Sequence, residues 1–323
     1  MRRIFAKAAL GVTLALSTLG AARAESYPSR PITMVVPFSA GGGTDILARL
    51  VAREMETVLQ QPVVVDNRPG ASGAVGAENV MRSPPDGYKL LFGTSSVLAI
   101  APVLQGGASA HLINAFDPVS LVATTALILA VPGNSKILTL KDYVGASKKA
   151  PLTYGTFGNG STPHLLGELF AKTSGADMVH VPYKGAAQAL NDAAGGHIDS
   201  VFLTVTSLAG NLKDKSTRGL AVADTERLAQ FPDIPTFAQE GYAGLDDGGW
   251  FAIFLPKGVP AEIRDILSGA IARVLSSEKV AREFLTVGMT AQVSTPEQLQ
   301  ARWDASVKMV RTIQATTKID MSK

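Results

Sequence analysis

Residues 31–60 read PITMVVPFSAGGGTDILARLVAREMETVLQ, and this stretch decides the fold. Residues 32–38 form an apolar, β-branched run, which predicts a strand buried on both faces. A turn with three consecutive glycines follows, and Thr44 and Asp45 are good N-cap residues for a helix after it. Apolar side chains then recur at helical spacing as far as residue 59. The pattern predicts a strand, a glycine-rich turn and a helix.

The turn at residues 39–44 is a candidate anion site. It lies at the carboxyl end of the strand and the amino end of the helix, where unpaired N–H groups and the helix dipole favour an anion. Glycine lets the backbone approach a ligand closely because it has no Cβ. Such a turn can also serve only to pack the helix onto the sheet, so the motif alone leaves both interpretations open.

The N-terminus has the pattern of a secretory signal peptide. Residues 1–24 read MRRIFAKAALGVTLALSTLGAARA, with a basic start, a short apolar core and a small-x-small site that predicts cleavage after Ala24. The apolar run is too short to span a membrane, and no later stretch is long enough. The chain has no cysteine, so it has no disulfide and no cysteine to carry a lipid. We expect a free protein, in the periplasm if the cell has an outer membrane.

The charge balance changes once the signal peptide is set aside. Residues 1–24 carry four of the 30 basic side chains, which leaves 26 against 27 acidic ones. A nearly neutral protein is not a natural partner of nucleic acid. The remaining 299 residues suggest about two domains.

Two further strands follow the opening unit, at residues 63–65 and 88–92, and Ser72 is expected to cap the helix between them. The order βαβαβ predicts parallel strands with right-handed crossovers. Ligands of such sheets bind beyond the carboxyl ends of the strands. The turn that ends the third strand contains Ser95.

The second half of the chain repeats this logic. A short strand at residues 152–155 leads into TFGNGSTPH at residues 156–164, and a helix follows at residues 165–172. Thr162 is the expected N-cap, and Pro163 suits the first helical position. This is a second helix start able to hold an anion, although simple capping explains it as well.

We place domain crossings near Thr124 and Ala221. Domain 1 then comprises residues 25–124 and 222–323, and domain 2 comprises residues 125–221. Further strands are predicted at residues 178–183, 198–205, 219–223 and 250–255, and helices at residues 186–194, 261–276 and 278–287. Capping patterns at Thr139 and Thr295 mark two more helix starts.

The sequence offers little for catalysis. None of the four histidines pairs with another histidine or a carboxylate at metal-ligand spacing, and no G-x-S-x-G elbow occurs. His164 could face a ligand or be structural, and Lys184 could reach a carboxylate or remain solvated. We therefore favour binding over turnover. The alternatives are a secreted hydrolase or isomerase using His164 or Asp45, and a sensor that signals to a receptor protein.

The segments YPSRPITMVVPFSAGGGTD, DNRPGASGAVGAENV, LTYGTFGNGSTPHLLGELF and HVPYKGAAQAL carry a resemblance across the mature chain. The chain resembles the Bug receptors, the extracytoplasmic solute-binding proteins of tripartite tricarboxylate transporters. One departure is Leu203, where many relatives have an aspartate, so Thr204 is the nearest polar substitute.

The resemblance implies an α/β fold of the two-domain periplasmic-binding-protein class (Venus-flytrap, type II), each domain a mostly parallel sheet flanked by helices. It implies a monomer that holds a carboxylate between its domains and delivers it to membrane permease subunits, with no cofactor, metal or catalytic residue. The residues then expected to bind the ligand are Phe38, Ser39, Gly42, Gly43, Thr44, Asp45, Ser95, Thr156, Phe157, Gly158, Asn159, Gly160, Ser161, His164 and Thr204.

Overall fold

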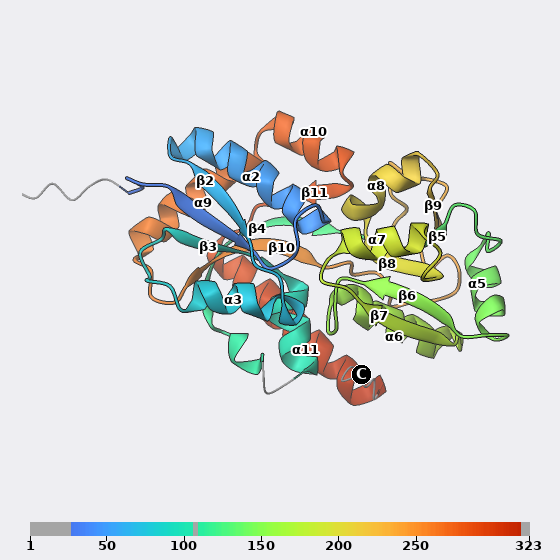
Figure 1. The fold of residues 1–323 in the computed structure, drawn as a ribbon. Helices are drawn as coiled ribbons and strands as arrows, with labels where there is room; N and C mark the ends of the chain where they lie inside the picture. Colours follow the sequence, from blue (N-terminus) through green and yellow to red (C-terminus); the bar gives the residue numbers. More distant parts are fainter. Residues whose placement is uncertain (1–26, 106–108, 318–323) are drawn as a thin grey trace, which may run out of the picture.

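The computed structural model describes residues 27–105 and 109–317, which fold into two α/β lobes lying side by side (Figure 1). The predicted signal peptide, residues 1–24, lies outside the described residues. Within the described part of the chain, no helix combines the length and the apolar character that a membrane crossing needs.

The sheet of the first lobe has the strand order β11-β4-β10-β3-β1-β2. Strands β1 (Ile32–Val36), β2 (Val63–Asn67) and β3 (Lys89–Thr94) are parallel, as predicted, so their carboxyl ends lie at one edge of the sheet. The antiparallel strands of this sheet are β4 (Phe116–Thr125), β10 (Trp250–Pro256) and β11 (Met289–Ala291).

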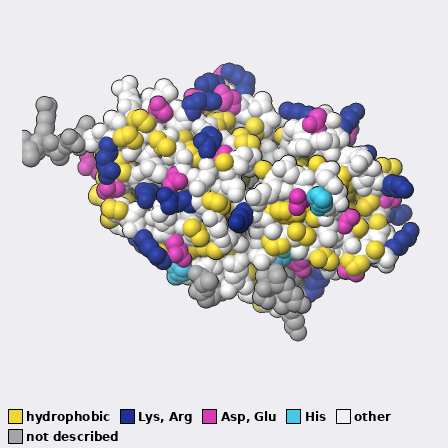
Figure 2. Space-filling model, viewed as in Figure 1, with side chains coloured by type: hydrophobic (Ala, Val, Ile, Leu, Met, Phe, Trp, Pro, Cys, Tyr) yellow, Lys and Arg dark blue, Asp and Glu magenta, His cyan; other side chains and the backbone are white. Residues whose placement is uncertain are grey.

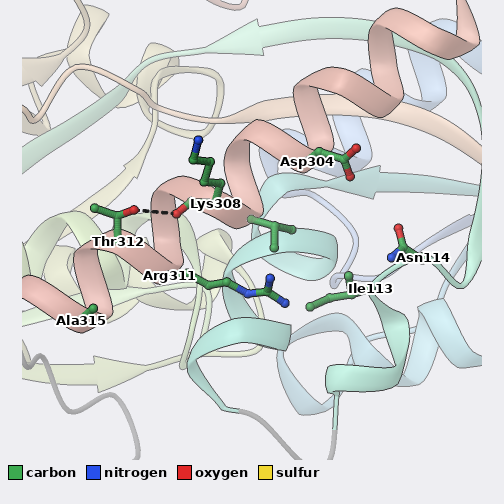
Figure 3. Close-up of a pocket in the computed structure, with 8 residues that line it drawn as sticks. Ile113, Asn114, Asp304, Lys308, Arg311, Thr312 and Ala315 are labelled. Carbon is green, nitrogen blue, oxygen red and sulfur yellow. Dashed lines mark hydrogen bonds between the residues drawn. The ribbon is translucent and has the colours of Figure 1, made fainter.

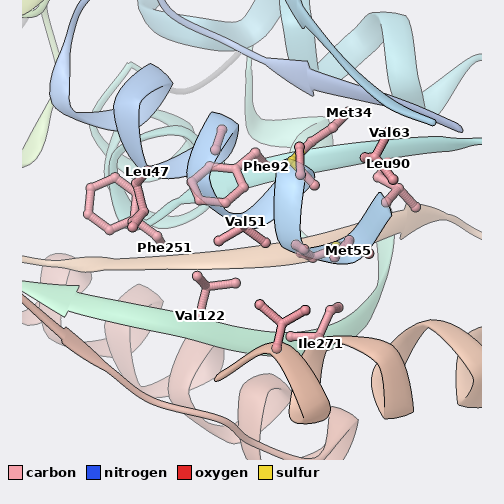
Figure 4. Packing of buried hydrophobic residues seen from close by; sticks show 14 of the residues in the cluster. Met34, Leu47, Val51, Met55, Val63, Leu90, Phe92, Val122, Phe251 and Ile271 are labelled. Carbon is pink, nitrogen blue, oxygen red and sulfur yellow. The ribbon is translucent and has the colours of Figure 1, made fainter. Parts of the chain in front are cut away.

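Helices cover both faces of this sheet. On one face, α2 (Gly43–Leu59) buries Leu47, Val51 and Met55, which recur every four residues, against Phe92 and Phe251 of the sheet (Figure 4). The other helices of that face are α9 (Ala261–Leu275) and α10 (Glu278–Thr286). On the opposite face lie α3 (Ala74–Met81) and α11 (Pro296–Thr317).

The sheet of the second lobe has the strand order β7-β6-β8-β5-β9. Strand β6 pairs in parallel with β7 and β8, whereas β5 pairs in antiparallel with β8 and β9. The strands are β5 (Leu127–Pro132), β6 (Leu152–Thr156), β7 (Met178–Pro182), β8 (Ser200–Thr204) and β9 (Thr217–Ala223). The helices are α5 (Leu140–Ser147), α6 (Thr162–Ser174), α7 (Ala186–Ala194) and α8 (Val205–Lys213).

Two segments connect the sheets. Ala126 alone separates β4 from β5, and residues 224–249 lead from β9 back to β10. Strand β9 pairs with β5 as far as Ala223. The domain limits of residues 25–124 with 222–323, and of residues 125–221, stay a prediction.

Five predicted helix starts can be compared with the structure. The capping patterns at Thr139 and Thr295 are confirmed, because each hydroxyl accepts the N–H group three residues ahead. Three other predicted caps are wrong: α2 is capped by Gly42, α6 by Ser161, and α3 follows Gly73. Ser72 cannot cap α3 because its φ of 55° places it in the left-handed region.

Helix α8 is a feature that the sequence analysis missed. We predicted a strand over residues 198–205, but β8 ends at Thr204, whose hydroxyl accepts the Ser207 N–H and caps α8. The β-branched residues Val205 and Thr206 continue the strand pattern, although they already belong to the helix. The strand therefore ends at the capping residue Thr204, although β-branched side chains continue beyond it.

Candidate functional site

Loops from both lobes enclose a cleft of about 210 Å³. The first lobe contributes the loops after β1 and β2, and the second lobe contributes the loops after β6 and β7. These loops meet because each follows the carboxyl end of a parallel strand, the edge at which open α/β sheets bind ligands. The cleft is lined by Pro37, Phe38, Gly70, Ala71, Ser72, Gly73, Phe157, Gly158, Asn159, Pro182, Tyr183 and Lys184.

Four of the expected ligand residues line this cleft: Phe38, Phe157, Gly158 and Asn159. The rings of Phe38 and Phe157 come from opposite lobes and meet edge to face, with centroids 5.3 Å apart. A pair of this geometry adds about 0.5–1.5 kcal/mol beyond the area it buries. The aromatic pair therefore favours the arrangement in which the lobes are together.

The cleft is rich in unpaired backbone donors. In the described residues, the N–H groups of Ala71, Ser72, Phe157 and Asn159 have no hydrogen-bond partner. The loop at residues 70–73 has positive φ throughout, and successive amides in such a turn can form a concave anion site. Lys184, which is exposed, is the one charged side chain among the lining residues. The cleft thus presents donors and a positive charge, and no carboxylate.

The glycine turn before α2 already holds a carboxylate, that of Asp45. Its Oδ2 accepts hydrogen bonds from the Gly41 N–H (2.9 Å) and Arg49 Nε (3.0 Å), and its Oδ1 accepts one from Asn67 Nδ2 (2.9 Å). Burial raises the pKa of this carboxyl, but the hydrogen bonds from Arg49, the Gly41 N–H and Asn67 outweigh it and hold the pKa below its ordinary value. Neither Asp45 nor Thr44 lines the cleft.

Four other expected ligand residues lie where the two lobes touch: Ser39, Gly42, Gly43 and Thr204. The Gly43 N–H donates to Ser207 Oγ at 3.0 Å, and Ser39 Oγ donates to the Lys184 carbonyl at 3.4 Å. A Cβ added at Gly43 would lie 2.7 Å from Thr204 Oγ1. The first turn of α2 and the first turn of α8 can approach this closely only because residue 43 is glycine.

Ser95 lies at a second contact between the lobes, beside the start of α6. Its hydroxyl is 3.2 Å from the Thr162 hydroxyl and accepts the Trp250 N–H at 3.4 Å. Ser96 Oγ accepts the Thr162 N–H at 3.0 Å. This turn therefore joins the lobes and does not line the cleft.

The last four expected residues are buried behind the glycine loop of the second lobe: Thr156, Gly160, Ser161 and His164. The Gly160 N–H donates to His164 Nδ1 at 3.1 Å, and Ser161 Oγ donates to the Gly158 carbonyl at 2.7 Å. Thr156 Oγ1 accepts the Gly158 N–H at 3.2 Å. These side chains shape the loop that lines the cleft, and they do not line it themselves.

The sequence analysis also missed a stacked histidine pair. The rings of His164 and His180 lie parallel within 13°, with centroids 3.6 Å apart. Burial, with His180 next to it, lowers the pKa of His164 to about 3, and burial lowers the pKa of His180 to about 4. The unfolded chain therefore takes up protons first as the pH falls below about 6.5, so acid destabilises the fold through both rings.

Glu168 has the opposite effect on stability: it favours the folded state when the pH falls. Its Oε1 is 3.9 Å from His164 Nε2 and accepts a hydrogen bond of 2.8 Å from the Tyr154 hydroxyl. Burial raises the pKa of this carboxyl, although the bond from Tyr154 lowers it in part. Because the folded state then binds the proton more tightly than the unfolded state, Glu168 offsets part of the loss caused by the histidines.

Two of the lining loops, at residues 70–73 and 182–184, were not on the list of expected contacts. The first follows β2 just as the glycine turn follows β1, and β1 and β2 are adjacent parallel strands. The same rule that selects the first turn could have selected it. We had read its Ser72 only as a helix cap.

In residues 27–105 and 109–317, no group of three or more His, Cys, Asp or Glu side chains could hold a metal ion. His164 and Asp45, the candidates for a hydrolase or isomerase, are bound to their neighbours, and neither lines the cleft.

A larger cavity, of about 570 Å³, lies along α11 in the first lobe (Figure 3). Ile113, Asp304, Lys308 and Arg311 are among its lining residues, and none of the expected ligand residues is. It belongs to one lobe and lies away from the loops that follow the parallel strands. We therefore take the smaller cleft, whose loops follow the parallel strands, as the candidate site.

Several known proteins are similar to this chain over most of its length. A sequence profile described as "Tripartite tricarboxylate transporter family receptor" matches residues 47–317. Protein BugT of Bordetella pertussis is 35% identical over 295 residues, which cover 90% of each chain. The solved periplasmic binding protein BugD is 30% identical with a TM-score of 0.87, over 91% of this chain and 99% of BugD. R. palustris Rpa4515, solved with adipate, is 31% identical with a TM-score of 0.86, over 91% and 99%. The expected periplasmic-binding-protein fold is thereby confirmed, but the two sheets are mixed and not mostly parallel, because half of their strand pairs or more are antiparallel.

Proposed function

Because the chain belongs to the tripartite tricarboxylate transporter receptor family, we propose that it captures a small carboxylate between its lobes and delivers it to a membrane permease. The resemblance to the Bug receptors is confirmed by BugT and BugD. The family supports both the ligand class and the partner. The cleft supports the ligand class as well.

The chemistry of the cleft carries this proposal. Lys184 and four residues with unpaired N–H groups line a space that no carboxylate side chain lines. Charge-assisted hydrogen bonds contribute about 1.5–3 kcal/mol each. Four of them would supply roughly 6–12 kcal/mol, against about 8 kcal/mol for micromolar affinity. Association has its own cost, so donors from both lobes must act together.

The size and the walls of the cleft favour a short solute. A volume of about 210 Å³ lies below the roughly 300–1,000 Å³ of pockets that hold drug-sized ligands. Phe38 and Phe157 suit the methylene groups of a ligand such as adipate, which Rpa4515 binds. The proposed contacts are Phe38, Ala71, Ser72, Phe157, Gly158, Asn159 and Lys184.

We also propose where the receptor acts, its oligomeric state and how its domains move. The receptor is released into the periplasm by cleavage after Ala24 and acts as a monomer that docks onto the permease subunits. Its domains comprise residues 25–124 with 222–323, and residues 125–221. They close about the two connections at residue 126 and residues 224–249. It binds its solute without turnover, in keeping with a family of receptors.

The test is a ligand titration of the mature protein, residues 25–323. Adipate at a hundredfold excess over its dissociation constant should stabilise the fold by about 2.7 kcal/mol, which is roughly 5 °C in Tm. Adipamide has the same chain without the charges, so it should leave Tm unchanged. Citrate, malate, benzoate and glutamate complete the panel. If no carboxylate shifts Tm, or if adipamide acts like adipate, the proposal is wrong.

A further inference from the structure

The second lobe carries a groove of about 570 Å³ at its outer end, and it shares no lining residue with the cleft. The groove lies between the start of β9, the connection from β5 to α5, and the turn at residues 230–234. Leu138, Phe231 and Pro232 form apolar walls. Leu138 is 60% exposed, so the apolar wall of the groove is accessible to a partner.

The groove contains a half-buried cation with no carboxylate partner, and a buried hydroxyl with no hydrogen-bond partner lies beside it. The half-buried Arg218 guanidinium donates to the carbonyls of Gly133 (3.2 Å), Ser135 (3.2 Å) and Ile137 (3.1 Å), and in the described residues no carboxylate pairs with it. Thr217 is only 4% exposed, and its hydroxyl has no hydrogen-bond partner.

Three lysines make the rim of the groove basic: Lys215 lines it, and Lys136 and Lys213 are sequence neighbours of residues that line it or bond to Arg218. Lys136, Lys213 and Lys215 are exposed, and none of them forms an ion pair within the described ranges. The acidic side chains here are Asp233, which lines the groove, and Asp214, whose carboxylate accepts the Ser216 N–H at 2.8 Å. Figure 2 shows Lys and Arg side chains gathered along the end of the molecule that α5 and α8 form. Positive charge therefore exceeds negative charge around the groove.

We propose that this groove docks an acidic segment of the membrane protein that receives the solute. The inference rests on the proposed delivery to a permease. A carboxylate of the segment would pair with Arg218 and Lys215, while an apolar neighbour covers Leu138. A flat anionic lipid surface would use the exposed lysines, but it would not reach the half-buried guanidinium of Arg218. The shape of the groove therefore favours a protein segment.

Site-specific cross-linking in the native bacterium tests the contact. A photoreactive p-benzoylphenylalanine at Leu138 of the full-length chain should cross-link to an integral membrane protein through an acidic periplasmic segment. The same group at Val64, which is 54% exposed on β2 of the first lobe, is the matched control and should not. Reversing two rim charges, Lys136→Glu with Lys215→Glu, should lower the cross-link yield by about tenfold. Equal yields from both positions, no membrane-protein product, or a yield that ignores the charge reversal would overturn the proposal.

Uptake and solute binding separate this proposal from the one it rests on. The charge-reversed variant should bind adipate with an unchanged dissociation constant, while uptake by cells falls by about tenfold. Normal uptake with normal binding refutes the docking groove and leaves the receptor function intact. If the wild-type protein binds no carboxylate, the receptor function is refuted. The docking contact is then judged from the cross-link alone. Charge-dependent binding to phosphatidylglycerol vesicles with no protein cross-link would assign the groove to lipid and also refute the proposal.

Discussion

Gly43→Ala should weaken ligand binding without weakening the ligand-free fold. The added methyl group would lie 2.7 Å from Thr204 Oγ1, 2.9 Å from Ser207 Oγ and 3.1 Å from Thr206 Cβ. All three atoms belong to the second lobe, whereas residue 43 opens α2 in the first lobe. The clash therefore exists only when the lobes are together.

The size of the effect follows from the crowding. Placing one extra methyl group in a packed site costs about 1–3 kcal/mol. If the whole of this cost falls on the closed arrangement, the dissociation constant rises by about 5- to 140-fold. With the lobes apart, Gly→Ala at a position whose backbone alanine can adopt stabilises a protein by about 0.4–1 kcal/mol, because it restricts the unfolded chain. The ligand-free variant should therefore unfold at the wild-type Tm or slightly above it.

Isothermal titration with adipate measures the affinity, and calorimetry of the ligand-free protein measures Tm. Gly42→Ala is the matched control, because a Cβ there would meet its nearest atom, the Ser39 carbonyl oxygen, at an ordinary 3.7 Å. Wild-type affinity in Gly43→Ala would refute the argument. So would an equal loss in both variants, since only residue 43 lacks room.

Two further predictions concern stability. Arg49→Ala should lower the free energy of unfolding by about 1–3 kcal/mol in urea, because it removes a charged partner of the buried Asp45. Arg282→Ala, which breaks an exposed pair of the same spacing, should cost no more than about 0.5 kcal/mol, and equal losses would contradict this reading. Lowering the pH from 7 to 5 should cost the wild type about 2 kcal/mol for each of His164 and His180, less what Glu168 offsets. His164→Phe should remove roughly half of that pH dependence, and an unchanged slope would show that the buried ring is not its source.

The strand and helix pattern of this chain could be predicted where local signals agree. The β-branched run of β1, the glycines after it and the periodic apolar residues of α2 all indicate one βαβ unit, and the structure contains it. The capping box at Thr139 worked for the same reason, because its partner Asp142 lies three residues away. The βαβ unit and the capping box are predictable because they depend on residues close together in the sequence.

The site was harder to predict because it depends on contacts between distant elements. The dipole argument found the helix start at α2, but the carboxylate of Asp45 already occupies it, and the i,i+4 spacing of Asp45 and Arg49 was the available sign. Nothing in the sequence brings His164 of α6 onto His180 of β7, since the stacking follows from how α6 packs on the sheet. The glycine loop lines the cleft, whereas the ligand contacts predicted for its buried residues stay a prediction.

A distance across the cleft decides whether the lobes close on a carboxylate. The chain has no cysteine, so spin labels at Ile46→Cys on α2 and Asn191→Cys on α7 would be its only two. Both side chains are exposed, and they belong to opposite lobes. Double electron–electron resonance should show the distribution shift to one shorter, narrower distance on adding adipate. A distribution that saturating adipate leaves unchanged, in a sample shown by titration to bind it, would contradict closure of the two lobes.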